Sequence, residues 1–164
     1  MITNFHELYK KYSQDVYRFA YWVCGNSQDA EDITSETFVR ALTFTGEIRF
    51  ETVKSYLLTI AKNLAYKKSK REKRFVSLDE EIIESDSRPA QRVEDSASAR
   101  IAMRFIQTLP EVDRAALILR LQDDLPYEEI ASVLSISIAA AKVKVHRARI
   151  KLTEYMQEQE EPQP

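Results

Sequence analysis

The sequence predicts an all-α protein with two small helical domains joined by a flexible linker, and three observations support this. Apolar residues recur at steps of three and four along most of the chain, which is the spacing of a buried helix face. The 164 residues include only two glycines and five prolines, too few for the turns of a sheet. An acidic, serine-rich stretch that contains Pro89 interrupts the periodicity. We therefore place an N-terminal domain at 1–76, the linker at 77–96, a C-terminal domain at 97–156 and a disordered tail at 157–164.

The composition narrows the class of protein. With 44% hydrophobic and 30% charged residues, the chain resembles an ordinary soluble protein. The lone cysteine, Cys24, excludes an internal disulfide and a cysteine-based zinc cluster, which suits a reducing compartment. No apolar run reaches membrane-spanning length, and the N-terminus lacks the apolar core of a signal peptide. We expect a cytoplasmic protein without membrane insertion.

The N-terminal domain should contain three helices. The first should end at Gly25, and its apolar positions are Phe5, Leu8, Tyr12, Val16, Phe19 and Val23. Asn26 or Ser27 can cap the second, whose predicted inner face consists of Ala30, Ile33, Phe38, Ala41 and Leu42. After a loop near Gly46, the third should bury Val53, Leu57, Ile60 and Leu64.

The C-terminal domain has the pattern of a helix-turn-helix unit. One helix is marked by Ile101, Phe105 and Leu109; another opens at Pro110 and should bury Val112, Ala116 and Leu119. Pro126 opens a short helix, Tyr127 to Leu134, which is followed by the turn Ser135-Ile136-Ser137 and a final helix. Ser135 stands where a glycine with positive φ would be easier, so we expect this turn to be slightly strained or to have a different shape.

The final helix has an unusual outer face. Its inner seam should be Ile138, Ala141, Val145, Ala148 and Leu152. Small and apolar residues point outward beside basic ones: Ala139, Ala140, Val143, His146, Arg147 and Ile150. Such a face suits insertion into the major groove of DNA, although packing against another helix is an alternative.

The charge distribution points to a polyanion. The net charge is only −2, but residues 62–74 carry seven bases against one acid and residues 142–151 carry five bases against none. A single basic run usually marks a solvated helix face. Two runs, one in each domain, favour a polyanion that is bound at two places.

Several motifs together resemble the extracytoplasmic-function (ECF) group of bacterial sigma factors. LPEVDRAALILRLQDDLPYEEIASVLSISIAAAKVKVHRARIKL is similar to the promoter −35 binding domain of that family, and NSQDAEDITSETFVRAL with VKSYLLTIAKNLAYKKSKR is similar to its N-terminal domain. The resemblance implies a specificity subunit of bacterial RNA polymerase that recognises the −35 and −10 promoter elements and assists melting. It implies core polymerase, promoter DNA and an anti-sigma factor as partners, with no cofactor, metal or catalytic residue. The alternative is a helix-turn-helix regulator that binds operator DNA without polymerase.

The resemblance also assigns residues to three surfaces. The residues expected to bind polymerase are Asp29, Glu31, Asp32, Glu36 and Thr37. Contacts to the −10 element and melting fall to Phe44, Phe50, Tyr56, Lys62, Asn63, Tyr66, Lys67, Lys68 and Arg71, although Tyr56 can equally be a core residue. Contacts to the −35 element fall to Ala140, Lys142, Val143, Lys144, His146, Arg147, Arg149 and Lys151. Tyr56 replaces a common tryptophan and Lys67 an aspartate, while Ala139 and Ala140 replace glycine and threonine, so the preferred promoter sequence does not follow.

Overall fold

The computed structural model describes residues 5–44, 52–76 and 96–160, and these residues form seven α-helices. The helices are α1 (Phe5–Cys24), α2 (Ser27–Thr43), α3 (Val53–Val76), α4 (Ala97–Ile106), α5 (Glu111–Leu121), α6 (Tyr127–Leu134) and α7 (Ile138–Glu160). The all-α prediction is confirmed. Phe50 and nearly all of the predicted linker lie outside the described residues.

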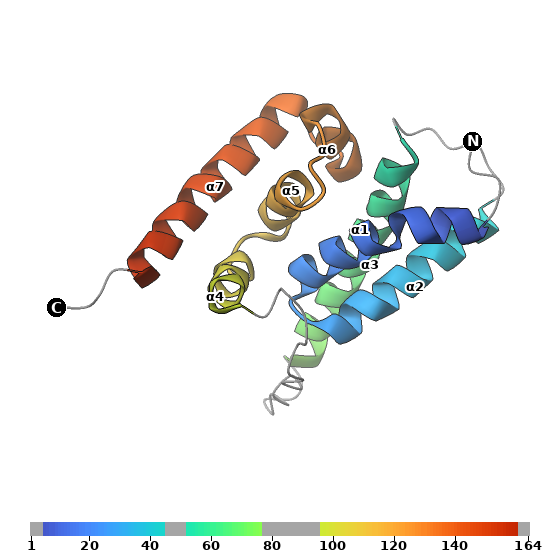
Figure 1. Ribbon diagram of the computed structural model, residues 1–164, viewed down its shortest axis with the longest axis horizontal. Helices are drawn as coiled ribbons and strands as arrows, with labels where there is room; N and C mark the ends of the chain where they lie inside the picture. The colour runs from blue at the N-terminus through green and yellow to red at the C-terminus, as the bar shows by residue number, and fades with distance from the viewer. Residues whose placement is uncertain (1–4, 45–51, 77–95, 161–164) are drawn as a thin grey trace.

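Helices α1, α2 and α3 pack against one another and form the N-terminal lobe (Figure 1). Gly25, with φ of +83°, ends α1 where the sequence predicted. Asn26 is the N-cap of α2, because its side chain accepts a hydrogen bond from the backbone N–H of Asp29 at 2.8 Å. The core of this lobe is built from Val16, Phe19, Val23, Ile33, Phe38, Leu57 and Leu58.

Helices α4 to α7 form the C-terminal lobe, in which α6 and α7 are the predicted helix-turn-helix unit. Both bounds of α6 match the prediction. Ser135 adopts the left-handed conformation, with φ of 55°, which confirms the strained turn. The Ser137 hydroxyl then accepts a hydrogen bond from the backbone N–H of Ala140 at 3.0 Å and caps α7.

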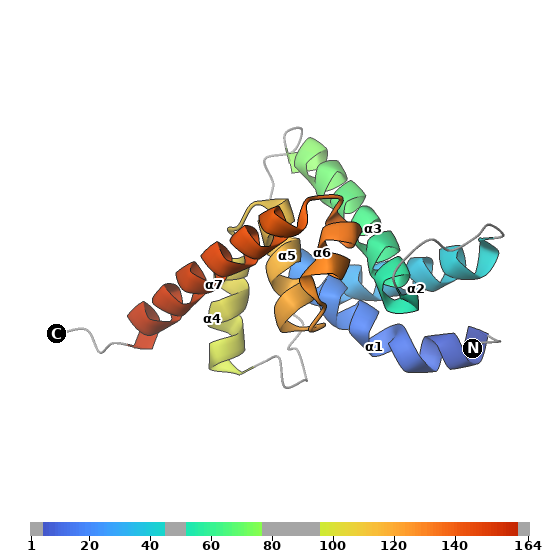
Figure 2. The same ribbon diagram turned by 90° about the horizontal axis from the view of Figure 1, so that it is seen from above.

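The two lobes dock against each other. Helix α5 packs on α1, and α6 packs on α3, as the two views in Figures 1 and 2 both show. One cluster of buried apolar side chains runs from Val16 and Leu57 in the first lobe to Ile106 and Leu117 in the second. The short α6 is thus held between α7 on one side and α3 on the other.

Some predicted core positions are exposed instead. Phe5, Leu42 and Ile138 are 41%, 60% and 43% exposed, so each lies outside the core. Helix α4 ends at Ile106, before the predicted core residue Leu109, although Leu109 is buried. Helix α7 continues to Glu160, into the segment that the sequence assigned to the tail. No helix in the described part of the chain is long and apolar enough to cross a membrane.

Candidate polymerase and nucleic-acid interfaces

The outward face of α7 is available to a partner along its whole length. Val143 and Ile150 are each 45% exposed, and the basic and imidazole side chains beside them are exposed as well: Lys142, His146, Arg147, Arg149 and Lys151. Ala141, Val145 and Ala148 are buried on the opposite side, as predicted. The helix therefore presents a thin basic ridge with apolar residues along its centre, which is the shape and chemistry that a major groove accepts.

Two side chains near this ridge already have partners within the lobe. Lys144, predicted to contact the DNA backbone, forms an ion pair with Asp113 of α5 at 2.8 Å. The ring of Tyr127 lies 4.8 Å from the Arg120 guanidinium carbon and 6.0 Å from Lys142 Nζ, measured to the ring centroid. These cation–π contacts orient Lys142 at the start of the ridge.

Helix α3 carries a second basic face. Asn63, Lys67 and Arg71 are exposed and follow one another at intervals of four, so they form one track along the helix. Lys70 is exposed on the same side, although it was not predicted as a DNA contact. Its spacing from Lys67 and Asn63 places it on the same helix face and could have indicated this. At the start of the helix, the exposed ring of Phe44 packs at a tilt of 48° against the ring of Tyr56, with the two centroids 5.9 Å apart.

Three other α3 residues assigned to DNA lie inside the docked structure. Tyr56 is 9% exposed and Lys62 is 8% exposed, so Tyr56 takes the core alternative. Burial lowers the pKa of Lys62, whose Nζ lies 5.5 Å from the ring centroid of Tyr66. The Tyr66 hydroxyl is buried without a hydrogen-bond partner, and burial raises its pKa to about 12. In this arrangement Tyr56 and Lys62 are buried, whereas Tyr66 is partly exposed with only its hydroxyl buried.

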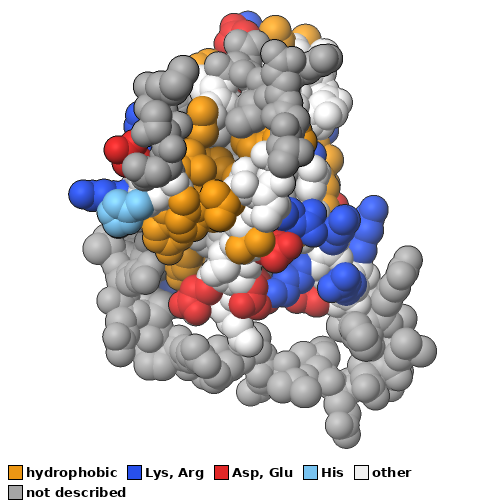
Figure 3. Space-filling view, turned by 90° about the vertical axis from the view of Figure 1, so that its right-hand side faces the viewer, with side chains coloured by type: hydrophobic (Ala, Val, Ile, Leu, Met, Phe, Trp, Pro, Cys, Tyr) orange, Lys and Arg blue, Asp and Glu red, His pale blue; other side chains and the backbone are white. Residues whose placement is uncertain are grey.

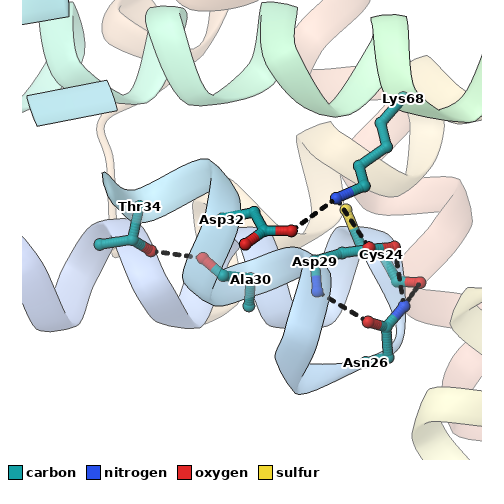
Figure 4. A network of polar contacts seen from close by, with 7 residues as sticks. All are labelled: Cys24, Asn26, Asp29, Ala30, Asp32, Thr34 and Lys68. Carbon is teal, nitrogen blue, oxygen red and sulfur yellow. Dashed lines mark hydrogen bonds and ion pairs between the residues drawn. The ribbon is translucent and has the colours of Figure 1, made fainter. Parts of the chain in front are cut away.

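The acidic helix α2 and the basic helix α3 meet in one network (Figure 4). Lys68 Nζ lies 2.8 Å from Asp29 Oδ1 and 3.2 Å from Asp32 Oδ2. Asn26 also donates a hydrogen bond to Asp29, at 2.9 Å. The sequence had placed Lys68 on the DNA surface and the two acids on the polymerase surface. In the structure Lys68 and Asp29 bind each other, and their assignment to the DNA and polymerase surfaces stays a prediction.

The pKa shifts of Asp29 and Lys68 both favour the charged ion pair. Burial opposes the charge of Asp29, but hydrogen bonds from Lys68 and Asn26 outweigh it and lower the pKa of Asp29. Burial likewise opposes the charge of Lys68, and hydrogen bonds to Asp29 and Asp32 outweigh it and raise the pKa of Lys68. Both charges thus stabilise the lobe between the ordinary pKa values of an aspartate and a lysine, about pH 4 to about pH 10.

Replacing Lys68 by Met should lower the free energy of unfolding by about 1 kcal/mol at pH 7, because Asp29 loses a charged partner at a half-exposed site. The loss should shrink as pH falls below 4 toward the lowered pKa of Asp29, and as pH rises above 10 toward the raised pKa of Lys68. Urea unfolding at pH 3, 7 and 10.5 measures this. Lys67→Met, an exposed neighbour, is the control, and equal midpoints for the two variants at pH 7 contradict the expectation.

The remaining acids of α2 form an exposed surface that continues into apolar residues. Glu31, Asp32 and Glu36 are exposed, whereas Thr37 is fully buried and donates a hydrogen bond to the Ile33 carbonyl at 2.7 Å. Thr37 therefore supports the helix from inside. Further along α2, two exposed apolar residues follow at helical spacing, Val39 (53% exposed) and Leu42 (60%).

The end of the molecule where α1 begins and α2 ends has a largely apolar surface. Figure 3 shows hydrophobic side chains gathered there between charged ones. The exposed members are Phe5, Tyr9, Val39, Leu42 and Phe44. Apolar periodicity predicts Phe5 and Leu42 as core residues, because periodicity alone does not distinguish a buried face from a docking face.

Two family models match the chain, one for each lobe. Residues 8–75 match the model of sigma-70 region 2, and residues 99–152 match that of sigma-70 region 4. The matches end close to the bounds of the docked lobes.

The chain is also similar to characterised sigma factors. It is 31% identical over 160 residues to the ECF RNA polymerase sigma factor SigE of Mycolicibacterium smegmatis, covering 94% of this chain and 62% of that protein. It is 30% identical to the ECF sigma factor SigM of Bacillus subtilis, covering 89% of this chain and 91% of that one. Thus it spans about three fifths of the first relative and nearly all of the second.

A solved structure shares the docked arrangement of helices. The sigma factor RpoE of Bartonella quintana, crystallised in complex with the anti-sigma factor NepR, is 25% identical, with a TM-score of 0.80 over 95% of this chain and 98% of that one. Fold, motifs and family models agree: the chain belongs to the ECF sigma factors of the sigma-70 family, non-enzymatic RNA polymerase subunits that direct transcription initiation.

Proposed function

We propose that three surfaces of this sigma factor divide the work of initiation, and that the face of α7 reads the promoter −35 element. The observation that supports this most directly is the exposed ridge of α7. Arg147, His146 and Lys142 have donors for base edges and phosphates, and Val143 offers methyl groups to thymine. Arg149 and Lys151 lie to the side, where backbone phosphates pass. Lys144 can contact a phosphate only after its ion pair with Asp113 breaks.

The N-terminal lobe is assigned to the −10 element and to polymerase. The α3 track of Asn63, Lys67, Lys70 and Arg71 suits the displaced strand, and the exposed ring of Phe44 offers a stacking platform for an unpaired base. The α2 surface of Glu31, Asp32, Glu36, Val39 and Leu42 is assigned to core polymerase. This combination pairs a charged rim with apolar contacts, as protein interfaces do.

Two further assignments follow from the relatives. A sigma factor acts where polymerase and chromosomal DNA are, so we place the protein in the cytoplasm. The solved B. quintana relative is bound to an anti-sigma factor. We extend a regulatory partner of that class to this chain.

The decisive experiment is binding to bacterial core RNA polymerase, followed by run-off transcription from candidate promoters. The sigma-factor assignment predicts a stable complex and promoter-dependent transcripts only when both components are present. An operator-binding regulator would instead bind promoter fragments tightly without polymerase. Absence of a complex with core enzyme overturns the assignment of the α2 surface.

Replacing Arg147 by Ala should weaken binding at one −35 position by about 1 to 3 kcal/mol, because a base contact of arginine contributes about that much discrimination. Lys151→Ala, which we assign to the phosphates, should weaken binding to all promoters alike and reduce the salt dependence. Competition between promoter variants for the holoenzyme measures both. A uniform loss for Arg147→Ala would reassign Arg147 to the phosphate backbone.

A further inference from the structure

The contact between the two lobes is built from specific polar bonds. Gln107 Nε2 donates to the Trp22 carbonyl at 2.8 Å, and Arg114 donates to the Val23 carbonyl at 3.0 Å. Both carbonyls belong to the last turn of α1, where the helix has no partners of its own. At the other end of the contact, Lys54 of α3 donates to the Asp123 carbonyl at 3.0 Å.

The docked lobes are too close together for both promoter elements. Positions −35 and −10 are about 25 base pairs apart, which is roughly 85 Å of B-DNA. A compact chain of this length is only about 40 Å across, and the whole of α7 is about 35 Å long. Lys62 and the Tyr66 hydroxyl of the α3 surface are buried in the docked structure, and the charged groups near Tyr66 are Glu111, Asp113 and Arg114 of α5. Given the proposed function, the lobes have to separate before the protein engages a promoter.

One carboxyl group in the contact has no partner. Asp123 follows α5 and is 5% exposed, and neither of its carboxylate oxygens has a hydrogen-bond donor. The charged groups that face it are Asp15 and Arg18 of α1 and Lys54 of α3. Lys54 lies 4.0 Å from Asp15 and bonds the backbone carbonyl of Asp123.

The charged neighbours within the second lobe do not satisfy this carboxyl either. Arg120 donates to the Leu125 carbonyl at 3.0 Å and lies 3.8 Å from the exposed carboxylate of Asp124. A charged carboxylate that is buried without a donor is strongly disfavoured, whereas the protonated form is neutral.

We propose that the docked arrangement is a closed state that takes up one proton at Asp123, and that loss of this proton drives the lobes apart. Separation should expose Asp123 to water, because the charged groups that face it, Asp15, Arg18 and Lys54, come from α1 and α3 of the other lobe. The charged carboxylate is then hydrated, so the open state releases the proton.

The direction of the pH effect follows from the burial. Burial raises the pKa of Asp123 from the ordinary value near 4 to about 8 in the closed state. Below pH 4 both states bind the proton, and the carboxyl imposes no penalty on closure. Between pH 4 and pH 8 the ratio of closed to open molecules should fall by up to tenfold per pH unit. The two hydrogen bonds to α1 oppose this opening.

Small-angle X-ray scattering of the full chain, without polymerase, tests the proposal between pH 5 and pH 9. The radius of gyration of the native protein should rise with pH, whereas Asp123→Asn, a neutral isostere, should stay compact throughout. Asp124→Asn is the matched control: it removes the same charge one residue away from a side chain that is 91% exposed. Its backbone φ of 49° also suits asparagine, so this control should follow the native protein.

The native protein and each variant are also measured in a Gln107→Ala background. This substitution removes one hydrogen bond to α1, so that closed and open molecules are both populated between pH 5 and pH 9. Asp123→Ser serves as a second neutral variant, and circular dichroism establishes that every variant is helical. The proposal is overturned if the radius of gyration depends on pH in the same way in the native protein and in both Asp123 variants, with and without Gln107→Ala. Because no polymerase or DNA is present, the result is independent of the assigned promoter and polymerase surfaces.

Discussion

Replacing Arg114 by alanine is expected to lower the free energy of unfolding by about 3 kcal/mol, the largest effect of any polar substitution considered for this protein. The guanidinium donates to four backbone carbonyls, at distances of 2.9 to 3.1 Å. Three of them, Ile106, Gln107 and Leu109, form the turn between α4 and α5, and the fourth, Val23, ends α1. Alanine leaves all four without this donor.

The geometry makes this arginine hard to replace. Its planar fork directs donors from three nitrogens to separate carbonyls, which a lysine ammonium at a single point cannot do. The positive charge also lies at the C-terminal end of α1, where the helix dipole favours it. Arg114→Lys should therefore recover less than half of the lost stability.

Thermal unfolding measures the effect, and a loss of about 3 kcal/mol should lower the melting temperature by roughly 10 °C in a chain of this size. Arg120→Ala, on the same helix, is the control because Arg120 bonds one carbonyl, Leu125, and an exposed carboxylate. Its loss should be about 1 kcal/mol. Equal melting temperatures for the two variants would show that the four bonds of Arg114 do not stabilise the fold.

The sequence was sufficient to predict the helices and the helix-turn-helix unit. Gly25, Asn26, Pro110 and Pro126 mark helix ends because each has a backbone or side-chain property that a helix terminus requires. The seam of α7 followed from periodicity because Ala141, Val145 and Ala148 are all buried on the side where α7 packs on α4, α5 and α6. Only Ile138, in the first turn, deviates, since α7 begins there and the lobe does not extend over it.

The docking of the lobes could not be predicted in this way. The sequence predicted a buried face of α3 at Val53, Leu57, Ile60 and Leu64. Leu57 is fully buried as predicted, but the other three are only partly buried, and the buried face extends to Leu58, Ala61 and Ala65. These residues lie one position further along the chain, which is about 100° around the helix. Small alanines permit close approach without contributing to an apolar stripe, and the buried Lys62 resembles a solvated base in sequence. A helix that packs on α1, α2 and α6 has no single apolar face.

The polymerase surface illustrates the same limit. Acidic residues in the first turns of α2 can serve the helix dipole, a neighbouring lysine or a partner protein, and the sequence pattern is identical in each case. The structure separates these roles, because Asp29 is bonded to Lys68 and Asn26, whereas Glu31 and Glu36 remain exposed. Within the described part of the chain, Glu36 pairs only with Arg40 of its own helix, at 3.0 Å.

Reversing both exposed charges, Glu31→Lys with Glu36→Lys, is expected to weaken binding to core polymerase by about 100-fold. The two lysines repel the basic partner surface that the two glutamates attracted. Each reversed charge costs on the order of 1 to 2 kcal/mol at a partly solvated interface. The wild-type affinity should fall as salt rises, and that of the variant should depend little on salt. Fluorescence anisotropy of labelled protein with core enzyme at several salt concentrations measures both.

Two further variants test whether the loss of affinity comes from the position of the charges on α2, from the net charge of the protein or from apolar contact. Glu154→Lys with Glu158→Lys makes the same charge change on exposed residues of α7 and should leave binding to core unaltered. Leu42→Ser removes an apolar side chain that is 60% exposed at the end of the same surface. It should weaken binding without altering the salt dependence, because it removes buried apolar area and no charge. If the α7 variant loses as much affinity as the α2 variant, the attraction is a property of net charge and α2 is not the docking helix.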